Sequence, residues 1–250
     1  VYKRQGLTHF EAFFGSYYFW RLLRNTLTIS LSSLVIGFPA PIIFALLLNE
    51  LRSERFKKIV QTVTYLPHFI SMVVMCGLIR LFTQDTGVVV QALSLFGFEP
   101  VSLLSRAEYF VPVYVLSGVW QGIGWGSIIY LSALTGIDPE LYEAATIDGA
   151  NRWRQTLHVT LPGIAPTIII MLLLRMGSVM SVGYEKIILL YNDGILETAD
   201  VISSFVYRRG LLNYEWSYST AVGLFNSVIN FILIVLFNRL SRALSETSLW

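Results

Sequence analysis

Charge is scarce in this chain of 250 residues: Asp, Glu, Lys and Arg make up 14% of it, against roughly 25% in soluble globular proteins. Hydrophobic residues make up 54% and the net charge is only +2. A surface that faces water cannot be built from so few charged side chains, so the composition predicts an integral membrane protein. The small net charge also gives no indication of a nucleic-acid partner.

Several chemical signatures are missing as well. The one cysteine, Cys76, lies in an apolar run and can form no intrachain disulfide. The chain has no G-x-x-x-x-G-K-[ST] phosphate loop, no H-E-x-x-H and no G-x-S-x-G, and His9, His68 and His158 are isolated in the sequence. We therefore expect no metal ligands, no cofactor on this chain and no catalytic residues, and any ATP must be bound by another protein.

Five apolar stretches are long enough to cross about 30 Å of hydrocarbon, which takes about 20 residues as a helix. They cover approximately residues 25–48, 60–82, 109–135, 166–182 and 218–237. Pro39, Pro41 and Pro67 lie within them and predict kinks, which membrane helices tolerate. The sequence thus predicts an all-α, polytopic membrane protein, with residues 1–250 forming a single transmembrane domain.

The short loop 49–58 carries four basic residues, Arg52, Arg55, Lys57 and Lys58. The positive-inside rule places such a loop in the cytoplasm. Alternation of the spans then places residues 136–165 on the same side. Residues 1–24 are rich in aromatic side chains and are typical of a segment at the level of the lipid headgroups.

The loop 136–165 is polar and strongly patterned. Asp138 is a good N-cap, and Pro139 suits the first helical position because its missing N–H costs nothing there. A short helix is predicted over about 139–147, ending at Gly149. A second is predicted over about 151–158, ending before Leu161-Pro162. Two short helices joined at a glycine would form a compact knob.

This loop resembles a known signature. Its pattern is Glu143-Ala144-Ala145-x3-Gly149-x9-Val159-x-Leu161-Pro162, and it is similar to the EAA motif of permease subunits in binding-protein-dependent ABC importers. The one departure is Val159, where the signature often has Ile. The resemblance implies that the loop docks on an ATP-binding subunit, with coupling residues Glu143, Ala144, Ala145, Asp148, Gly149, Leu161 and Pro162. The alternative is a hairpin that merely connects two spans.

Two further stretches, residues 18–27 and 197–202, resemble the branch of that family that takes up oligosaccharides and polysaccharides. Such permeases usually have six helices, which implies one more before residue 1. The implied partners are two ATP-binding subunits, which hold ATP and Mg²⁺, a second homologous permease and an extracytoplasmic solute-binding protein, all at a bacterial cytoplasmic membrane. Two alternatives stay open: an ABC permease for peptides or amino acids, and a secondary transporter, although paired carboxylates within the spans are lacking.

Polar residues within the spans are candidates for a substrate pathway because they are costly in lipid. Arg175 lies midway along the fourth predicted span. Asn226 and Asn230 belong to a polar stripe on the last span, which faces either a partner helix or an aqueous path. Trp120 and Gln121 could contact sugars or simply pack. They flank Gly118, Gly122 and Gly126, whose G-x-x-x-G spacing predicts close helix packing.

Overall fold

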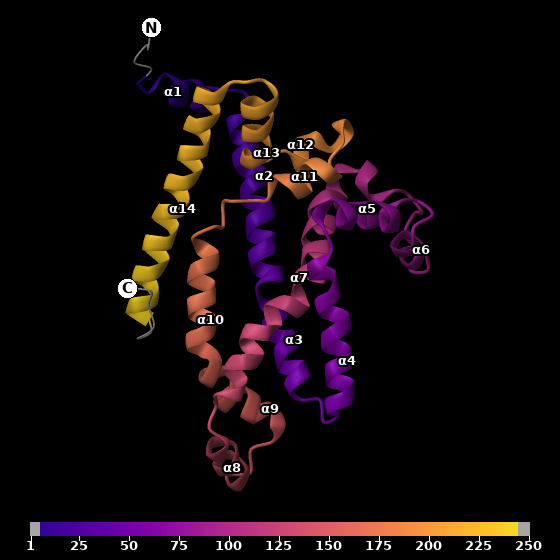
Figure 1. Ribbon diagram of the computed structural model, residues 1–250, viewed down its shortest axis with the longest axis vertical. Helices are drawn as coiled ribbons and strands as arrows, with labels where there is room; N and C mark the ends of the chain where they lie inside the picture. The colour runs from indigo at the N-terminus through magenta and orange to yellow at the C-terminus, as the bar shows by residue number, and fades with distance from the viewer. Residues whose placement is uncertain (1–5, 245–250) are drawn as a thin grey trace. The chain divides into compact units, whose positions relative to one another are not determined.

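The computed structural model describes residues 6–244, and within that range it contains helices and no strand. The α-helices are α1 (Thr8–Phe14), α2 (Phe19–Ser32), α3 (Pro39–Asn49), α4 (Glu54–Tyr65), α5 (Met72–Thr83), α6 (Val88–Ser94), α7 (Ala107–Thr135), α8 (Pro139–Ile147), α9 (Arg152–Gln155), α10 (Leu161–Met176), α11 (Tyr184–Leu190), α12 (Leu196–Ala199), α13 (Ile202–Tyr207) and α14 (Trp216–Leu244) (Figure 1). Short 3-10 and π segments join them: η1 (Ser33–Gly37), η2 (Leu66–Phe69), η3 (Leu103–Ser105), η4 (Thr156–Thr160), η5 (Asp193–Ile195) and η6 (Arg208–Leu212). The predicted all-α fold is confirmed.

Four helical segments of the described chain are long and apolar enough to cross a membrane: Phe19–Asn49, Met72–Ser94, Arg152–Met176 and Trp216–Ala243. The first and fourth of these cover the first and fifth predicted spans, whereas the third ends at Met176, before the predicted end of the fourth span at residue 182. Helix α7, which is 29 residues long, covers the third predicted span. It is not among the four apolar segments above.

The second predicted span, 60–82, is wrong as a single helix. Helix α4 ends at Tyr65, and a 3-10 turn follows at Leu66–Phe69 because Pro67 has no backbone N–H to donate. Helix α5 then starts after Ser71, whose hydroxyl caps it by accepting from the Val74 N–H at 3.5 Å. The apolar stretch therefore starts at Met72, and α4 ends before it.

The chain forms two compact units. The first contains the described residues up to Ile36, Phe69–Gly118 and Val179–Phe231. Its core is apolar and joins α2, α5, α7 and α11 through Ile29, Met75, Phe110 and Ile187. The second contains Gly37–His68, Val119–Ser178 and the described residues from Ile232 on. The prediction of a single domain over 1–250 stays a prediction, and residues 1–5 and 245–250 lie outside the described residues.

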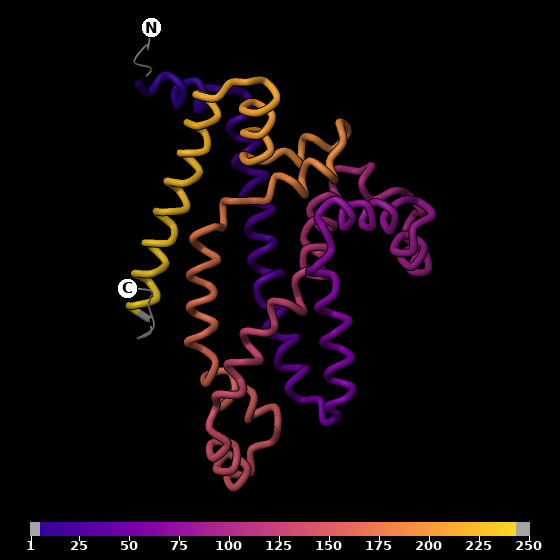
Figure 2. Tube along the Cα trace, in the orientation of Figure 1, coloured from indigo at the N-terminus to yellow at the C-terminus, as the bar shows by residue number. Residues whose placement is uncertain are grey.

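The core of the second unit joins α3, α7 and α10 around Ile42, Tyr130, Leu134 and Ile164. Figure 2 follows the chain from the end of α7 through the loop 136–160 and back into α10. Since both flanking helices contribute to this core, the two ends of the loop are held by packed apolar side chains.

Close packing on α7 depends on a glycine that the G-x-x-x-G spacing does not include. A Cβ atom on Gly124 would lie 2.3 Å from the Thr64 carbonyl oxygen of α4. On Gly126 it would lie 3.0 Å from the Pro41 ring, whereas on Gly122 it would meet nothing within 4 Å. Gly124 therefore sets the approach of α4 to α7, and the predicted packing role does not extend to Gly122 within the described chain.

We expect Gly124→Ala to destabilise the protein by about 1–3 kcal/mol, because the added methyl group overlaps backbone that cannot move aside. Thermal unfolding of the purified protein measures this effect. Gly122→Ala is the matched control on the same helix and should be neutral or slightly stabilising, since alanine favours helix more than glycine does. Equal unfolding temperatures for the two variants would contradict the packing role of Gly124.

Candidate functional site

The loop 136–160 is built as the sequence predicts at its first helix. Asp138 caps α8, and its Oδ1 accepts a hydrogen bond from the Glu140 N–H at 2.9 Å. Pro139 occupies the start of the helix. These two residues satisfy the helix N-terminus locally, so α8 forms at a defined position without help from a partner.

The other end of α8 closes with a Schellman motif at Gly149, whose φ is +76°. The Gly149 N–H donates to the Thr146 carbonyl at 3.0 Å, and the Ala150 N–H donates to the Ala145 carbonyl at 2.9 Å. A β-branched side chain is strained at this φ, so the backbone favours glycine here. The predicted role of Gly149 as helix terminator is confirmed.

The second predicted helix does not end before Leu161-Pro162, so that boundary is wrong. Helix α9 starts after Asn151, whose side chain accepts from the Arg154 N–H at 2.9 Å. It continues through the π segment η4 into α10 without a break. Pro162 follows this π segment in the first turn of α10, where a missing N–H is tolerated. Leu161 and Pro162 thus open helix α10, with Leu161 half-buried and Pro162 exposed.

Side-chain contacts hold the two short helices together as one knob, residues 138–160. The Tyr142 hydroxyl lies 3.0 Å from the Thr160 hydroxyl. The Gln155 amide donates to the Thr146 hydroxyl at 2.9 Å and to the Ala150 carbonyl at 3.2 Å. The knob is therefore fixed to the start of α10.

An ion pair joins the knob to the end of α3, with Arg152 Nη1 2.8 Å from Glu50 Oε2. Both side chains are about half exposed or more, so water screens the pair and its contribution to stability is small. Its effect is to orient α9 beside α3.

The outer surface of the knob combines apolar and acidic side chains. Glu143, Ala144 and Asp148 are exposed. Leu141, Ile147 and Trp153 are 53%, 87% and 69% exposed. Sequence reasoning missed these three, although apolar residues in an otherwise polar loop were a signal for them. Large apolar side chains gathered on an exposed element are typical of a surface that binds another protein.

The polar stripe on α14 divides into two environments. Asn230 is 8% exposed, and its amide is fully used: Oδ1 accepts from the Met180 N–H and Nδ2 donates to the Ser181 hydroxyl, both at 2.9 Å. It satisfies the backbone that follows α10, which is a structural role.

Asn226 faces a cavity of about 700 Å³ in the first unit, which we call the pathway cavity. Its buried Oδ1 has no hydrogen-bond partner among the described residues, nor has the Ser219 hydroxyl on the same wall. The rings of Tyr184 and Tyr207 also line this cavity and stack with centroids 5.1 Å apart. Polar residues next to stacked rings suit a polar ligand with an apolar face.

The other predicted pathway residues lie elsewhere. Helix α10 ends at Met176, so Arg175 is exposed in its last turn and not midway along a span. A cation is favourable at that position because of the helix dipole. Trp120 and Gln121 lie on α7 in the second unit, as does Arg175, whereas the two asparagines belong to the first. No single unit holds all five.

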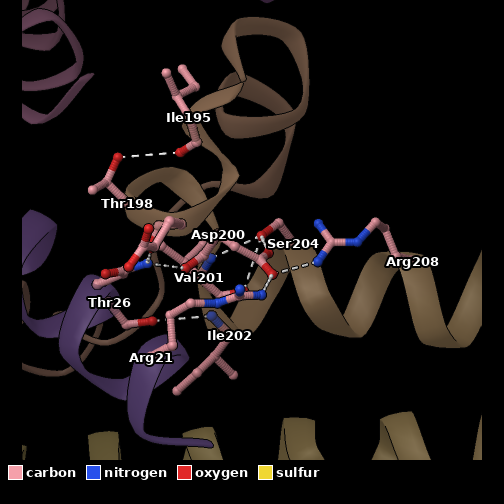
Figure 3. Close-up of polar contacts among 11 residues, drawn as sticks. Arg21, Thr26, Ile195, Thr198, Asp200, Val201, Ile202, Ser204 and Arg208 are labelled. Atoms are coloured by element: carbon pink, nitrogen blue, oxygen red, sulfur yellow. Dashed lines mark hydrogen bonds and ion pairs between the residues drawn. The ribbon is translucent and has the colours of Figure 1, made fainter. Parts of the chain in front are cut away.

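The two stretches that suggested the oligosaccharide branch bond to each other in the structure (Figure 3). Arg21 of α2 lies 3.4 Å from the Asp200 carboxylate. The Asn25 amide donates to the carbonyls of Glu197 and Asp200, at 2.7 and 2.9 Å. Residues about 175 positions apart are thereby joined into one network.

Asp200 lies at the centre of this network and its side chain has no exposure to solvent. Besides Arg21, it accepts from Arg208 at 2.5 Å and from the Ser204 hydroxyl at 2.7 Å (Figure 3). Burial by itself lowers the pKa of Arg208, but the hydrogen bond and charge of Asp200 hold that pKa above its ordinary value. The buried carboxylate is thus stabilised by two cations.

We expect Asp200→Asn to lower the free energy of unfolding by about 3–5 kcal/mol, because it leaves two partly buried guanidinium groups without their counter-ion. Thermal unfolding and the yield of folded protein measure the loss. The matched control is Glu99→Gln, which removes the acid of an exposed pair with Arg106 at 2.9 Å and should change little. Similar small effects for both variants would show that Asp200 is not the anchor of this region.

Comparison with known proteins decides the family. Residues 37–246 match the binding-protein-dependent transport system inner membrane component family. The chain belongs to this family. It is a membrane-embedded permease subunit of a transport system, as the EAA-like loop predicted, and the secondary-transporter alternative is excluded.

Three relatives are especially similar. The polygalacturonan/rhamnogalacturonan transport system permease protein YteP of Bacillus subtilis (strain 168) is 44% identical over 98% of this chain and 77% of its own length. A bacterial alginate ABC transporter solved with an alginate pentasaccharide-bound periplasmic protein contains a chain that is 44% identical, with a TM-score of 0.92 over 98% of this chain and 85% of that one. A second structure of a bacterial ABC transporter involved in alginate import gives 46% identity and a TM-score of 0.91, covering 95% and 84%.

Proposed function

We propose that this chain is the translocation subunit of an ATP-driven ABC importer for oligosaccharides or polysaccharide fragments, in a bacterial cytoplasmic membrane. The cargo class is supported by sequence identity: this chain is 44–46% identical, over nearly its whole length, to proteins named for galacturonan or alginate transport. Peptide or amino-acid cargo is less well supported: the methionine transporter MetNI is 13% identical, which indicates the fold alone.

In this proposal the chain catalyses no reaction and holds no cofactor. Two ATP-binding subunits supply ATP, Mg²⁺ and hydrolysis, a second homologous permease completes the pathway, and an extracytoplasmic solute-binding protein delivers the cargo. The alginate-transporter neighbour, which was solved with a periplasmic protein, supports this set of partners. The knob would be the surface that meets an ATP-binding subunit.

The knob is suited to transmit motion because it has no loose joint to the membrane helix. Helix α8 is closed at both ends, at Asp138 and Gly149, and hydrogen bonds hold it on α9 and η4. Helix α9 then runs through η4 into α10. A displacement of α8 by a docked subunit would therefore move α10 directly, and α10 packs into the core of the second unit. That is how a motor outside the membrane would change the path within it.

We predict that Glu143→Lys and Gly149→Val lose substrate-stimulated ATPase activity in the assembled transporter. The first reverses a charge on the exposed face of α8. The second forces valine into a left-handed conformation that costs roughly 1–2 kcal/mol and distorts the end of the knob. ATPase assays on proteoliposomes, with and without cargo, measure the coupling.

Gly149→Asn is the control for the second variant, because asparagine tolerates positive φ and should retain most of the coupling. All three variants should insert and assemble, since none of these side chains is buried. Normal coupled transport by both Glu143→Lys and Gly149→Val would remove the coupling role of the knob.

The two asparagines of α14 test the pathway. Asn226→Leu should reduce uptake several-fold while complex yield and basal ATPase activity stay normal, because Asn226 lines the pathway cavity and its amide holds no other part of the described chain through a hydrogen bond at Oδ1. Asn230→Leu should instead lower stability by roughly 1–3 kcal/mol, since it leaves the buried Met180 N–H unpaired. Uptake and complex yield are measured together on each variant. The opposite assignment, with Asn226→Leu reducing yield and sparing uptake, would make Asn226 a packing residue.

A further inference from the structure

A second cavity in the first unit, of about 540 Å³, has no part in the function proposed above. It lies between residues 9–18, at α1 and the turn after it, and residues 209–218, where η6 leads into α14. We call it the outer cavity, since the orientation predicted from the loop 49–58 places this end of α14 outside the cytoplasm. Its size is that of a small-molecule site. Its walls include Tyr17, Tyr18, Arg209, Tyr214, Glu215 and Trp216.

The aromatic side chains of this cavity are unusually exposed. Tyr17 is 88%, Tyr214 73% and Trp216 55% exposed. Each offers an apolar ring face together with a polar O–H or N–H. A sugar ring has the same two characters, because its C–H groups form an apolar face and its hydroxyls form a polar rim. The rings therefore match a carbohydrate better than a purely apolar ligand.

The charged groups of the cavity neutralise each other. Arg209 Nη1 lies 2.9 Å from Glu215 Oε1. The guanidinium lies against the rings of Phe205 and Tyr218, at 5.7 and 5.6 Å from their centroids, which fixes its plane. Its Nε is buried and has no hydrogen-bond partner among the described residues. A fixed pair presents donors and acceptors side by side, which suits adjacent hydroxyls, and it carries no net charge that would select a carboxylate.

The backbone beside this pair is strained. Tyr214 has φ +59°, which is uncommon for a residue other than glycine and is sustained only where its surroundings demand it. Hydrogen bonds enforce it: the Asn213 N–H donates to the Arg208 carbonyl at 3.0 Å, and the Glu215 N–H donates to the Arg209 carbonyl at 2.9 Å. The turn brings the Tyr214 ring to the cavity, 6.1 Å from the ring of Trp216.

Trp216 lines the outer cavity and the pathway cavity alike. We propose that the outer cavity is a carbohydrate-binding site, which holds one end of the oligosaccharide by ring faces and hydroxyls and passes it along Trp216 to the pathway cavity. The site rests on the proposed function, since it needs a sugar as cargo. Because the Arg209–Glu215 pair is neutral, it accepts acidic and neutral sugars alike.

The test uses the assembled transporter in lipid nanodiscs, without solute-binding protein or nucleotide. Saturation-transfer NMR and calorimetry measure its binding of two probes, trigalacturonate and neutral galactotriose. Tyr17→Leu removes one ring, and Tyr214→Asn removes another while keeping a residue that tolerates positive φ. Each should weaken the binding of both probes by about five- to tenfold, which is the size of a lost aromatic contact, with no loss of thermal stability for Tyr214→Asn.

Trp20→Leu is the matched control, because that ring is 75% exposed but does not line the cavity. Its binding should equal wild type; equal weakening in all three variants would assign these rings to the lipid interface and overturn the proposal. Binding of trigalacturonate alone would overturn recognition by the neutral Arg209–Glu215 pair.

Asn226→Leu distinguishes failure of the outer site from failure of the proposed function. If Asn226→Leu abolishes uptake while Tyr17→Leu and Tyr214→Asn bind the probes normally, the outer site is wrong and the proposed function stands. A wild-type complex that neither binds nor transports any sugar would overturn both the outer site and the proposed function.

Discussion

The first unit depends on one buried carboxylate. Asp200 cannot be stable as an isolated charge without solvent, so the chain must bring Arg21 and Arg208 to it from α2 and from η6. The same contact fixes the direction of α13 and η6, which supply Ser203 and Tyr207 to the pathway cavity and Arg209 to the outer cavity. Both cavities therefore adjoin this network: Arg21 stacks on the ring of Tyr18, which lines the outer cavity, and Ile202 lines the pathway cavity. The stretches 18–27 and 197–202, which resemble one branch of the family, are the two halves of this contact.

In the second unit the main constraint is the rigidity of an exposed loop, the knob. Most loops between membrane helices have few contacts of their own, but the knob satisfies its helix ends with its own residues and bonds Tyr142 and Gln155 across its two helices. The π segment η4 is the important joint. It leads directly into α10, and Pro162 stands in the first turn of that helix, where its missing N–H breaks nothing. Continuity from knob to membrane follows from that one local feature.

The sequence predicted those features that depend on neighbouring residues. Asp138, Pro139 and Gly149 fix α8 by capping rules alone, and the structure reproduces it with the predicted bounds. Predictions that depended on distant parts of the chain were less successful. To predict the break of the second span, Ser71 had to be recognised as the N-cap of α5 after Pro67. Gly124 could be identified as the packing glycine only from the position of the α4 backbone. The EAA spacing indicated the family, but it gave no sign that Leu161 and Pro162 belong to helix α10.

The contrast between Asn226 and Asn230 shows why a polar stripe cannot be interpreted from its spacing. The two side chains are one turn apart on α14 and have the same chemistry, yet one is satisfied by the chain end after α10 and the other is not. A buried polar atom without a partner costs roughly 1–3 kcal/mol. Asn226 Oδ1 and Ser219 Oγ carry this cost on the wall of the pathway cavity, and Arg209 Nε carries it at the outer cavity. Each of these atoms is buried beneath the cavity surface, so a ligand would reach it only after the side chains that cover it had moved.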